Sequence, residues 1–374
     1  MNAIFVYSLE QTAKKIAWTN SSVSLLKVPE APVEGGGCTY PDLMDEAALL
    51  EWAGVSFGKG ETYRLYLAIK ALAESLPGEA GRARFFGKIT TRGKPYWVVE
   101  VLSTFEGEEA DPTKVEGKEG GNKFQYYVSQ APEDNKSWVV LPQLTMAQVQ
   151  TSRQFKRLLT GDLDAAVPTF PVFPGTERSL LRAIIGRIAG ATSISPDGYY
   201  ALDDEGEIKP AEAEDLAGAF PKGGEAMKDP EAWKHHECDL NVLGRVKAMP
   251  EQLGEDGEPI VEEEPVEATP NLNGLTPENW SMRVGPGGAG LAATSGAIAK
   301  SLLWPGAVAV AAGRRYLNCY VGNGVMYDPK PYSPNLPKRT ESEWAPAEEE
   351  TPLVETEDVR NDPTPPKSDE PEEE

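Results

Sequence analysis

The stretch at residues 301–327 constrains the fold more than any other part of the 374-residue chain. An apolar run at 292–304 predicts a helix. The proline–glycine pair at 305–306 ends this helix, because proline lacks an amide donor and crowds the preceding turn. Residues 307–311 then predict a buried strand, and residues 316–321 alternate large and small side chains as a returning strand does. We therefore expect a helix, a sharp corner and a hairpin in one unit.

The rest of the chain mixes helical and strand patterns without regular alternation. Apolar residues at helical spacing predict helices at 41–53, 61–76, 142–159 and 177–189. Aromatic and β-branched runs predict a hairpin of 84–89 with 96–102, and further strands at 124–128, 138–141 and 280–284. The predicted fold class is α+β, with helices and antiparallel strands or hairpins mixed in one large domain.

Composition divides the chain into one folded region and three segments of other character. Residues 1–40 end in prolines and a glycine triplet, which predicts a flexible N-terminal extension. Residues 203–275 read as a largely irregular acidic insertion with one short helix at 229–247. Residues 338–374 are dominated by Glu, Asp and Pro, which predicts a disordered acidic tail, since such a segment buries too little surface to offset its ordering entropy. The folded domain is therefore expected at 41–337.

Charge limits the classes of partner. The net charge of −23 argues against nucleic acid and anionic membrane surfaces, because both would repel the protein. We find no signal peptide and no apolar run long enough for a membrane span. The three cysteines, Cys38, Cys238 and Cys319, are far apart and predict neither a disulfide framework nor a zinc knuckle. We expect a soluble intracellular protein in a reducing compartment.

A glycine-rich loop supplies the alternative function. Residues 285–290 match G-x-G-x-x-G between an apparent strand and a helix, with Arg314 and Arg315 where a 2′-phosphate could sit, as in an NADP-binding oxidoreductase. Pro286 removes one backbone donor, and no further strand–helix alternation surrounds the loop. A Walker-type loop would need glycine where Ala299 stands. We therefore expect no cofactor.

Metal and nucleophile chemistry also lack a complete set of residues. His235, His236 and Cys238 lie close together, but adjacent histidines on a helix point about 100° apart and no second ligand cluster completes a tetrahedron. We interpret these residues as exposed positions on a helix. No assembled catalytic set is recognisable, so we predict a protein that is not an enzyme.

Partner contacts are the remaining candidate function. The helix at 177–189 is the most basic in the chain, and its arginines either pair with local carboxylates or form a docking face. Between residues 167 and 175, three prolines fix an extended path that Phe170 and Phe173 can anchor against a surface. Large amphipathic rings near residues 301–327 also suit a partner interface. The candidate interface residues are Arg178, Arg182, Arg187, Trp304, Arg314, Arg315, Tyr316 and Tyr320.

Three stretches together resemble one known family. The first is 51–70 (EWAGVSFGKGETYRLYLAIK) with 84–89 (RFFGKI); the second is 138–142, 155–165 (FKRLLTGDLDA), 173–175 and 181–188 (LRAIIGRI). The third is 301–307 (SLLWPGA) with 332–334. In this order they resemble the radial spoke head protein 4/6 family of cilia and flagella, from about residue 41 to residue 337. Residues 1–40, the 285–290 loop and the acidic insertion depart from the family's pattern.

The resemblance implies a non-catalytic structural subunit of the radial spoke head, which contributes to spoke-head assembly and meets the central pair apparatus. The implied partners are a second copy or a paralogue, a spoke-head protein 9 homologue, a MORN-repeat subunit and spoke stalk proteins, with transient contact to central pair projections. The implied location is the cytoplasm and cytoskeleton, in the ciliary or flagellar axoneme.

Overall fold

A computed structural model of the chain gives the fold. It describes residues 43–76, 82–102, 115–117, 120–132, 137–202, 208–211, 224–246, 272–285, 296–312 and 315–327. All of these belong to one compact unit, Met1–Tyr327, and the second unit, Asp328–Glu374, lies outside the described residues. The predicted N-terminal extension and acidic tail, and the glycine loop beyond Gly285, therefore also lie outside them.

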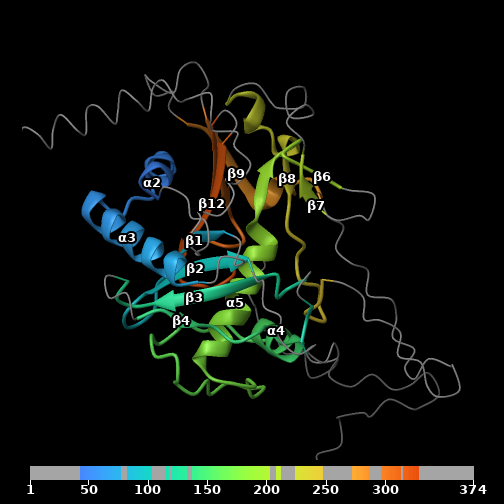
Figure 1. The fold of residues 1–374 in the computed structure, drawn as a ribbon. Coiled ribbons are helices and arrows are strands. Elements are labelled where there is room, and N and C mark those ends of the chain that lie inside the picture. Colours follow the sequence, from blue (N-terminus) through green and yellow to red (C-terminus); the bar gives the residue numbers. More distant parts are fainter. Residues whose placement is uncertain are drawn as a thin grey trace, which may run out of the picture. The chain divides into compact units, whose positions relative to one another are not determined.

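An eight-stranded sheet organises the described residues, in the order β4-β3-β2-β1-β12-β11-β10-β9 (Figure 1). Its strands are β1 (Ala83–Ile89), β2 (Tyr96–Leu102), β3 (Phe124–Ser129), β4 (Val139–Val140), β9 (Trp280–Val284), β10 (Ala297–Ser301), β11 (Ala307–Ala312) and β12 (Arg315–Gly322). The pair β1 and β12 is parallel, and the other neighbours in this sheet are antiparallel. The predicted α+β class is confirmed, as are the antiparallel pairs of β1 with β2 and of β11 with β12.

Four helices and two small sheets complete the described fold. The helices are α2 (Leu43–Trp52), α3 (Lys59–Ser75), α4 (Met146–Arg153) and α5 (Glu177–Thr192). Strand β5 (Ile194–Pro196) pairs with β8 (Trp233–His235), and β6 (Tyr200–Leu202) pairs with β7 (Ile208–Pro210). Short 3₁₀ turns are η1 (Ala226–Lys228), η2 (Pro230–Ala232) and η3 (Pro277–Asn279). Within the part of the chain that the structure describes, every helix is too short or too polar to span a membrane.

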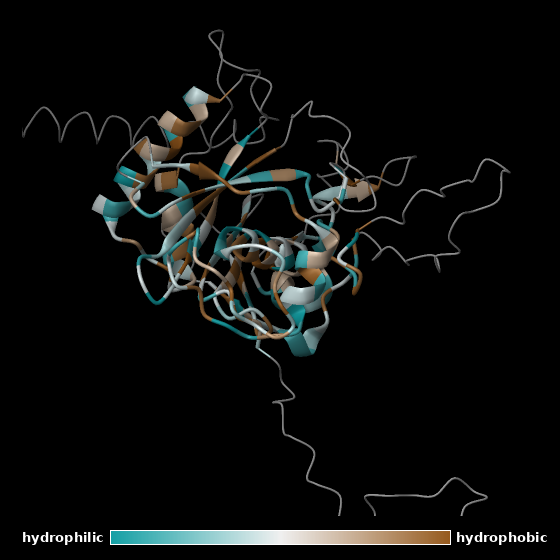
Figure 2. Ribbon diagram, turned by 90° about the horizontal axis from the view of Figure 1, so that it is seen from below, coloured by the Kyte–Doolittle hydropathy of each residue, from teal (hydrophilic) through white to brown (hydrophobic). Residues whose placement is uncertain are grey.

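The two faces of the large sheet carry separate cores. Side chains alternate along a strand, so Tyr96 and Val98 of β2 join one core while Trp97 and Val99 join the other. Helix α5 covers the first face, and α2 and α3 cover the second. Figure 2 shows apolar and polar residues alternating along the strands and helices, as expected for elements with one buried side.

At the β11-β10-β9 end of the sheet, small side chains allow the β5–β8 pair to pack closely against the sheet. Alanines of β10 and β11 line one face there, against the buried Trp233 and Met227 from the β5–β8 layer and its preceding turn. On the opposite face, Val308 and Val310 pack against α2. The alanines provide room for the Trp233 indole, which is fully buried and donates from Nε1 to the Met227 carbonyl at 2.7 Å.

The proline–glycine corner has the predicted position, but the segment before it is a strand. Gly306 has φ of 106°, and a Cβ there would lie 2.2 Å from the Val321 carbonyl oxygen, so only glycine fits. The expected helix at 292–304 is wrong where it is described, because residues 297–301 form β10. Alanine favours helices. Here, however, Ala297 and Ala299 alternate with Ile298 and follow the period of a strand that is buried on both faces.

Two further expectations are corrected. The helix expected at 142–159 is only α4, since the chain leaves the helix after Arg153 and packs Phe155 at 6.1 Å against Phe173. The helix expected at 229–247 is replaced by η2 and β8. The described parts of the acidic insertion are also not confined to the surface, since Met227 and Trp233 are core residues. Pairing of β8 with β5 draws this segment into the fold.

Candidate functional site

Arg178 is a partly exposed arginine at the start of the basic helix. It lies in the first turn of α5, and its Nη2 lies 3.0 Å from Oδ1 of Asp164. The two side chains are 35% and 81% exposed, so the ion pair lies in solvent and contributes little to stability. This pair agrees with the interpretation of a local carboxylate partner, and Arg178 remains accessible to a partner protein.

Arg182 is a core residue and forms no docking face. Its side chain is 2% exposed, and its Nη2 donates to the Gly121 carbonyl at 2.7 Å and to Asn122 Oδ1 at 3.1 Å. The guanidinium lies over the Tyr126 ring at 4.7 Å. Burial lowers the pKa of this guanidinium, and its partners among the described residues are carbonyl oxygens and a ring rather than a carboxylate.

Arg187 joins three elements inside the protein. Its Nη1 donates to the Ser152 carbonyl of α4 at 3.0 Å, and its guanidinium lies 5.3 Å from the centre of the Trp304 ring. Burial lowers its pKa to about 10, and the charge of Arg153 acts in the same direction. Arg187 therefore holds α5 against α4 and against the proline–glycine corner.

The aromatic candidates are also mainly internal. Trp304 is 2% exposed and Tyr320 is 1% exposed, and both belong to the core under α5. Tyr316 is half-buried and packs edge-on against Tyr199 at 4.7 Å. Arg314 lies outside the described residues, and Arg315 begins β12. The structure thus brings Arg187 and Trp304 together and places Tyr320 in the same core.

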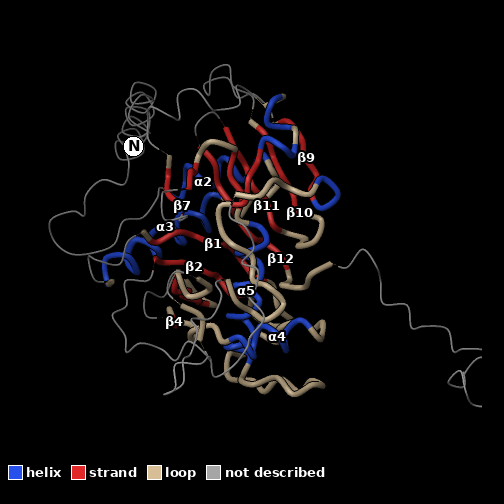
Figure 3. Tube along the Cα trace, turned by 90° about the vertical axis from the view of Figure 1, so that its right-hand side faces the viewer, coloured by secondary structure: helices blue, strands red, loops and turns tan. Residues whose placement is uncertain are grey.

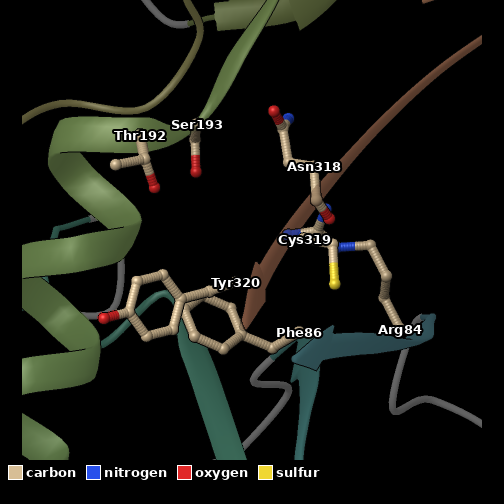
Figure 4. A pocket seen from close by; sticks show the side chains of 7 residues that line it. All are labelled: Arg84, Phe86, Thr192, Ser193, Asn318, Cys319 and Tyr320. Atoms are coloured by element: carbon tan, nitrogen blue, oxygen red, sulfur yellow. The ribbon is translucent and has the colours of Figure 1, made fainter. Parts of the chain in front are cut away.

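A small cavity lies between the end of α5 and strands β1 and β12 (Figure 4). Its volume is about 10 Å³, which is about the least space that one water molecule needs. Burial raises the pKa of the Cys319 thiol in its wall to about 12, so this sulfur is protonated and a poor nucleophile near pH 7. A cavity of this size cannot hold an organic substrate. Its lining residues are Arg84, Phe86, Thr192, Ser193, Asn318, Cys319 and Tyr320.

The prediction that the two histidines are exposed residues on a helix is wrong. His235 ends β8, and His236 is 7% exposed and stacks on Tyr200 with ring centres 4.8 Å apart. Burial lowers the pKa of His235 to about 4, and burial also lowers the pKa of His236 well below its ordinary value. The described residues contain no cluster of His, Cys, Asp or Glu suited to a metal ion.

The strand order also removes the basis of the dinucleotide site. Strand β9 ends at Val284, just before Gly285, and β10 pairs with it in antiparallel register. A dinucleotide loop joins a strand to a helix that leads to a parallel strand. The expected strand–helix–strand unit is therefore wrong, although residues 286–290 themselves lie outside the described part.

Comparison with known proteins decides the family. A family model described as radial spokehead-like protein matches residues 10–119 and 110–365. The chain belongs to the radial spokehead-like family. It is 31% identical over 374 residues to flagellar radial spoke protein 4 of Chlamydomonas reinhardtii, covering 88% of this chain and 79% of that protein. The resemblance seen in the three sequence stretches is thereby confirmed.

Mammalian relatives are longer than this radial spokehead-like chain. Radial spoke head protein 6 homolog A of Mus musculus is 31% identical over 376 residues, covering 81% of this chain and 52% of that protein. Radial spoke head protein 4 homolog A of Homo sapiens is 30% identical over 364 residues, covering 81% of this chain and 50% of that protein. The chain therefore spans about half the length of these two relatives.

The polar residue that most clearly fixes this radial spokehead-like fold was not anticipated from the sequence. Glu177, 2% exposed at the start of α5, accepts hydrogen bonds from Thr160 N and Oγ1, both at 2.7 Å. It also accepts from Gly161 N at 2.8 Å and from Tyr96 Oη at 2.9 Å. A carboxylate directly after Thr176 indicates a helix start. Its partners, up to 81 positions away, are visible only in the fold.

Proposed function

We propose that this chain is a non-catalytic structural subunit of the radial spoke head. The family match over most of the chain carries the proposal. The most similar relatives are named for radial spokes, one of them for the flagellum. The chain accordingly belongs to the axoneme of a cilium or flagellum.

The interior supports a scaffold role. Arg182, Arg187 and Glu177 hold helix α5, its neighbours and the preceding loop in fixed positions. Buried charged residues are frequent in catalytic sites. Here the hydrogen bonds of Arg182, Arg187 and Glu177 go to backbone groups of neighbouring elements. Such a block suits a subunit that transmits force between other proteins.

The finer parts of the function are also proposals. The expected neighbours are a second copy or paralogue, a spoke-head protein 9 homologue, a MORN-repeat subunit and stalk proteins. The acidic segments at 203–275 and 338–374 would face the central pair, where charge repulsion keeps contacts transient within a screening length of about 8 Å. Arg178, Arg314, Arg315 and Tyr316 remain the proposed partner contacts.

Localisation of a tagged full-length chain tests the main proposal. We expect the tag in axonemes that resist detergent, and at spoke-head positions in tomograms of those axonemes. A tubulin signal in the same fraction controls for axoneme recovery. If the tag were extracted completely by detergent while tubulin stayed behind, the proposal would fail.

Charge neutralisation tests the central pair contact separately. Replacing the carboxylates of residues 338–374 by amides should change beat regularity while the chain stays in the axoneme. An unchanged beat with normal incorporation would remove the electrostatic contact and leave the structural role intact.

A further inference from the structure

The proline-rich loop at residues 167–175 is fixed at both ends, where it leads into α5. Ala166 forms a bridge with Thr176, which closes the base of the loop. Val167 is 7% exposed and Phe173 is 3% exposed, and both side chains belong to the core under α5. Figure 3 shows this connection from α4 to α5 at the end of the fold away from β9.

Side chains outside the loop hold its backbone between these ends. Arg157 Nη1 donates to the Pro168 carbonyl at 3.2 Å, and Gln148 Nε2 of α4 donates to the Pro174 carbonyl at 3.1 Å. Within the loop, Thr169 Oγ1 donates to the Pro171 carbonyl at 3.0 Å. A loop with three prolines and these bonds is already ordered before any partner arrives, which reduces the entropy lost on binding.

The held loop presents two apolar side chains to solvent. Phe170 is 95% exposed and Val172 is 80% exposed. Of the two phenylalanines expected to anchor this segment against a surface, Phe173 packs in the protein's own core and Phe170 faces solvent. Apolar side chains scattered on a surface need no explanation. A fixed loop that aims an aromatic ring and a branched chain outward is different, because buried aromatic residues supply much of the energy of protein interfaces.

The charges beside the loop indicate what kind of partner would fit. Lys156 is exposed, and neither it nor Arg157 forms an ion pair with any described residue. The nearby carboxylate of Asp164 is already held by Arg178. Residues 153–178 carry four basic residues (Arg153, Lys156, Arg157 and Arg178) against three acidic ones (Asp162, Asp164 and Glu177), so this part of a chain of net charge −23 is slightly cationic. Charge complementarity therefore favours a partner that places carboxylates beside apolar side chains.

We propose that Phe170 and Val172, on the loop that Arg157 and its exposed chain neighbour Lys156 adjoin, form a docking tip for an acidic segment of a neighbouring protein. That segment would cover the Phe170 ring with apolar side chains and place carboxylates near Lys156. The inference goes beyond the proposed function, which names the assembly and assigns no such surface. The net charge of −23 disfavours a membrane as the occupant, because anionic lipid repels an acidic chain.

Photo-cross-linking in the native assembly tests the identity of the occupant. A full-length tagged chain carries p-benzoylphenylalanine in place of Phe170, and a matched chain carries it in place of Tyr63, which is 50% exposed on α3. After irradiation, mass spectrometry identifies the attached peptide. We expect position 170, and not position 63, to yield one protein segment with net negative charge and apolar side chains. A lipid adduct, a neutral or basic segment, or no adduct at position 170 overturns the proposal.

Binding of the identified peptide then tests the energetic roles. Against a fluorescent synthetic copy of it, the Phe170→Ser/Val172→Ser double variant should bind at least about tenfold more weakly. Lys156→Glu should weaken binding about threefold at low salt and less at high salt. The control Tyr63→Ser/Leu67→Ser, also exposed, should bind as the parent does. Unchanged affinity of the Phe170/Val172 variant, with an unchanged melting temperature, would refute the docking tip.

The outcomes separate this inference from the proposed function. Loss of the cross-link with the tag still in detergent-resistant axonemes would remove the docking tip alone. A cross-link to an acidic segment in a chain that never enters axonemes would keep the docking tip and remove the radial spoke role.

Discussion

The two faces of the large sheet are covered in chemically different ways. Under α3, packing is apolar: Leu65 is fully buried and Ile69 is 2% exposed, and the buried Thr62 bonds to Gly58 next to its own helix. Under α5, apolar side chains share the interface with Glu177 and Arg182, both 2% exposed. Apolar packing tolerates changes of shape, whereas each buried polar group needs its own partner. The buried polar contacts under α5 therefore fix the position of that helix on the sheet, whereas the apolar packing under α3 mainly stabilises the folded state.

The largest difference in unfolding free energy between the two faces should follow from substitutions that keep the size of the side chain. In Glu177→Gln, one acceptor oxygen becomes an amide donor that faces the amides of Thr160 or Gly161. We expect a loss of about 3 kcal/mol in unfolding free energy. Leu65→Met, on the other face, should cost less than about 1.5 kcal/mol. Urea unfolding of both variants measures the two values.

A third variant removes a hydrogen-bond donor to Glu177 but keeps the charge of its carboxylate. Tyr96→Phe removes one of the four donors to Glu177 and should cost about 1 kcal/mol. Burial and the bond to Glu177 both raise the pKa of Tyr96, so the hydroxyl remains protonated and a donor near neutral pH. Equal losses for Glu177→Gln and Leu65→Met would contradict the distinction between the faces.

Arg182 should produce an intermediate effect. Arg182→Met leaves the Gly121 carbonyl without its donor but also removes a buried charge, and Asn122 Oδ1 still accepts from Leu144 N at 2.7 Å. We expect a loss of about 2 kcal/mol. Arg182→Lys keeps the charge but loses the planar contact with Tyr126, so it should cost at least as much. A lysine variant as stable as the parent would show that charge alone matters here.

Local patterns predicted the apolar face better than the polar one. Residues 43–52 and the β1–β2 hairpin follow from helical spacing and from aromatic runs, because each pattern reports which face of an element is buried. Alanine-rich β10 was mistaken for a helix, because its small residues serve a close approach of layers that the sequence does not display. The short β5–β8 pair was missed for a related reason, since three residues carry no measurable period.

The candidate site shows the same limit. Arginines spaced along α5 look like an exposed cationic stripe, yet Arg182 and Arg187 point into the protein and bond to carbonyls contributed by distant segments. Nothing local in the sequence distinguishes these from Arg178. Alternation within the proline-rich segment likewise does not show which of its phenylalanines faces the core.

Acid should destabilise the β5–β8 pair, which follows α5 in the chain, before it destabilises helix α3. His235 and His236 are neutral when folded because burial lowers their pKa values, to about 4 for His235. The unfolded chain binds these protons near pH 6.5, so the stabilisation is complete above that pH and is lost as pH falls toward 4. We expect a loss of about 1 kcal/mol per histidine between pH 7 and pH 5.5. Glu237 acts in the opposite sense, since burial raises its pKa.

Hydrogen exchange locates the acid effect. On acidification to pH 5.5, amides of β5 and β8 should lose protection relative to pH 7, after correction for intrinsic exchange, while amides of α3 keep theirs. His236→Phe retains a ring against Tyr200 and should reduce the pH dependence. Uniform loss of protection in both regions would mean that the two faces unfold as one unit and are not separable by pH.

Arg178 should have the smallest effect on folding. Its ion pair with Asp164 is exposed, so Arg178→Ala should change unfolding free energy by less than about 0.5 kcal/mol. This makes Arg178→Glu a clean test of the basic helix as a docking face, whereas charge reversal at Arg182 or Arg187 would damage the core first. We expect Arg178→Glu to reduce retention of the chain in purified spokes, with Arg64→Glu on the exposed side of α3 as the control. Equal retention of both variants would argue against α5 as a docking face and leave this helix a packing role.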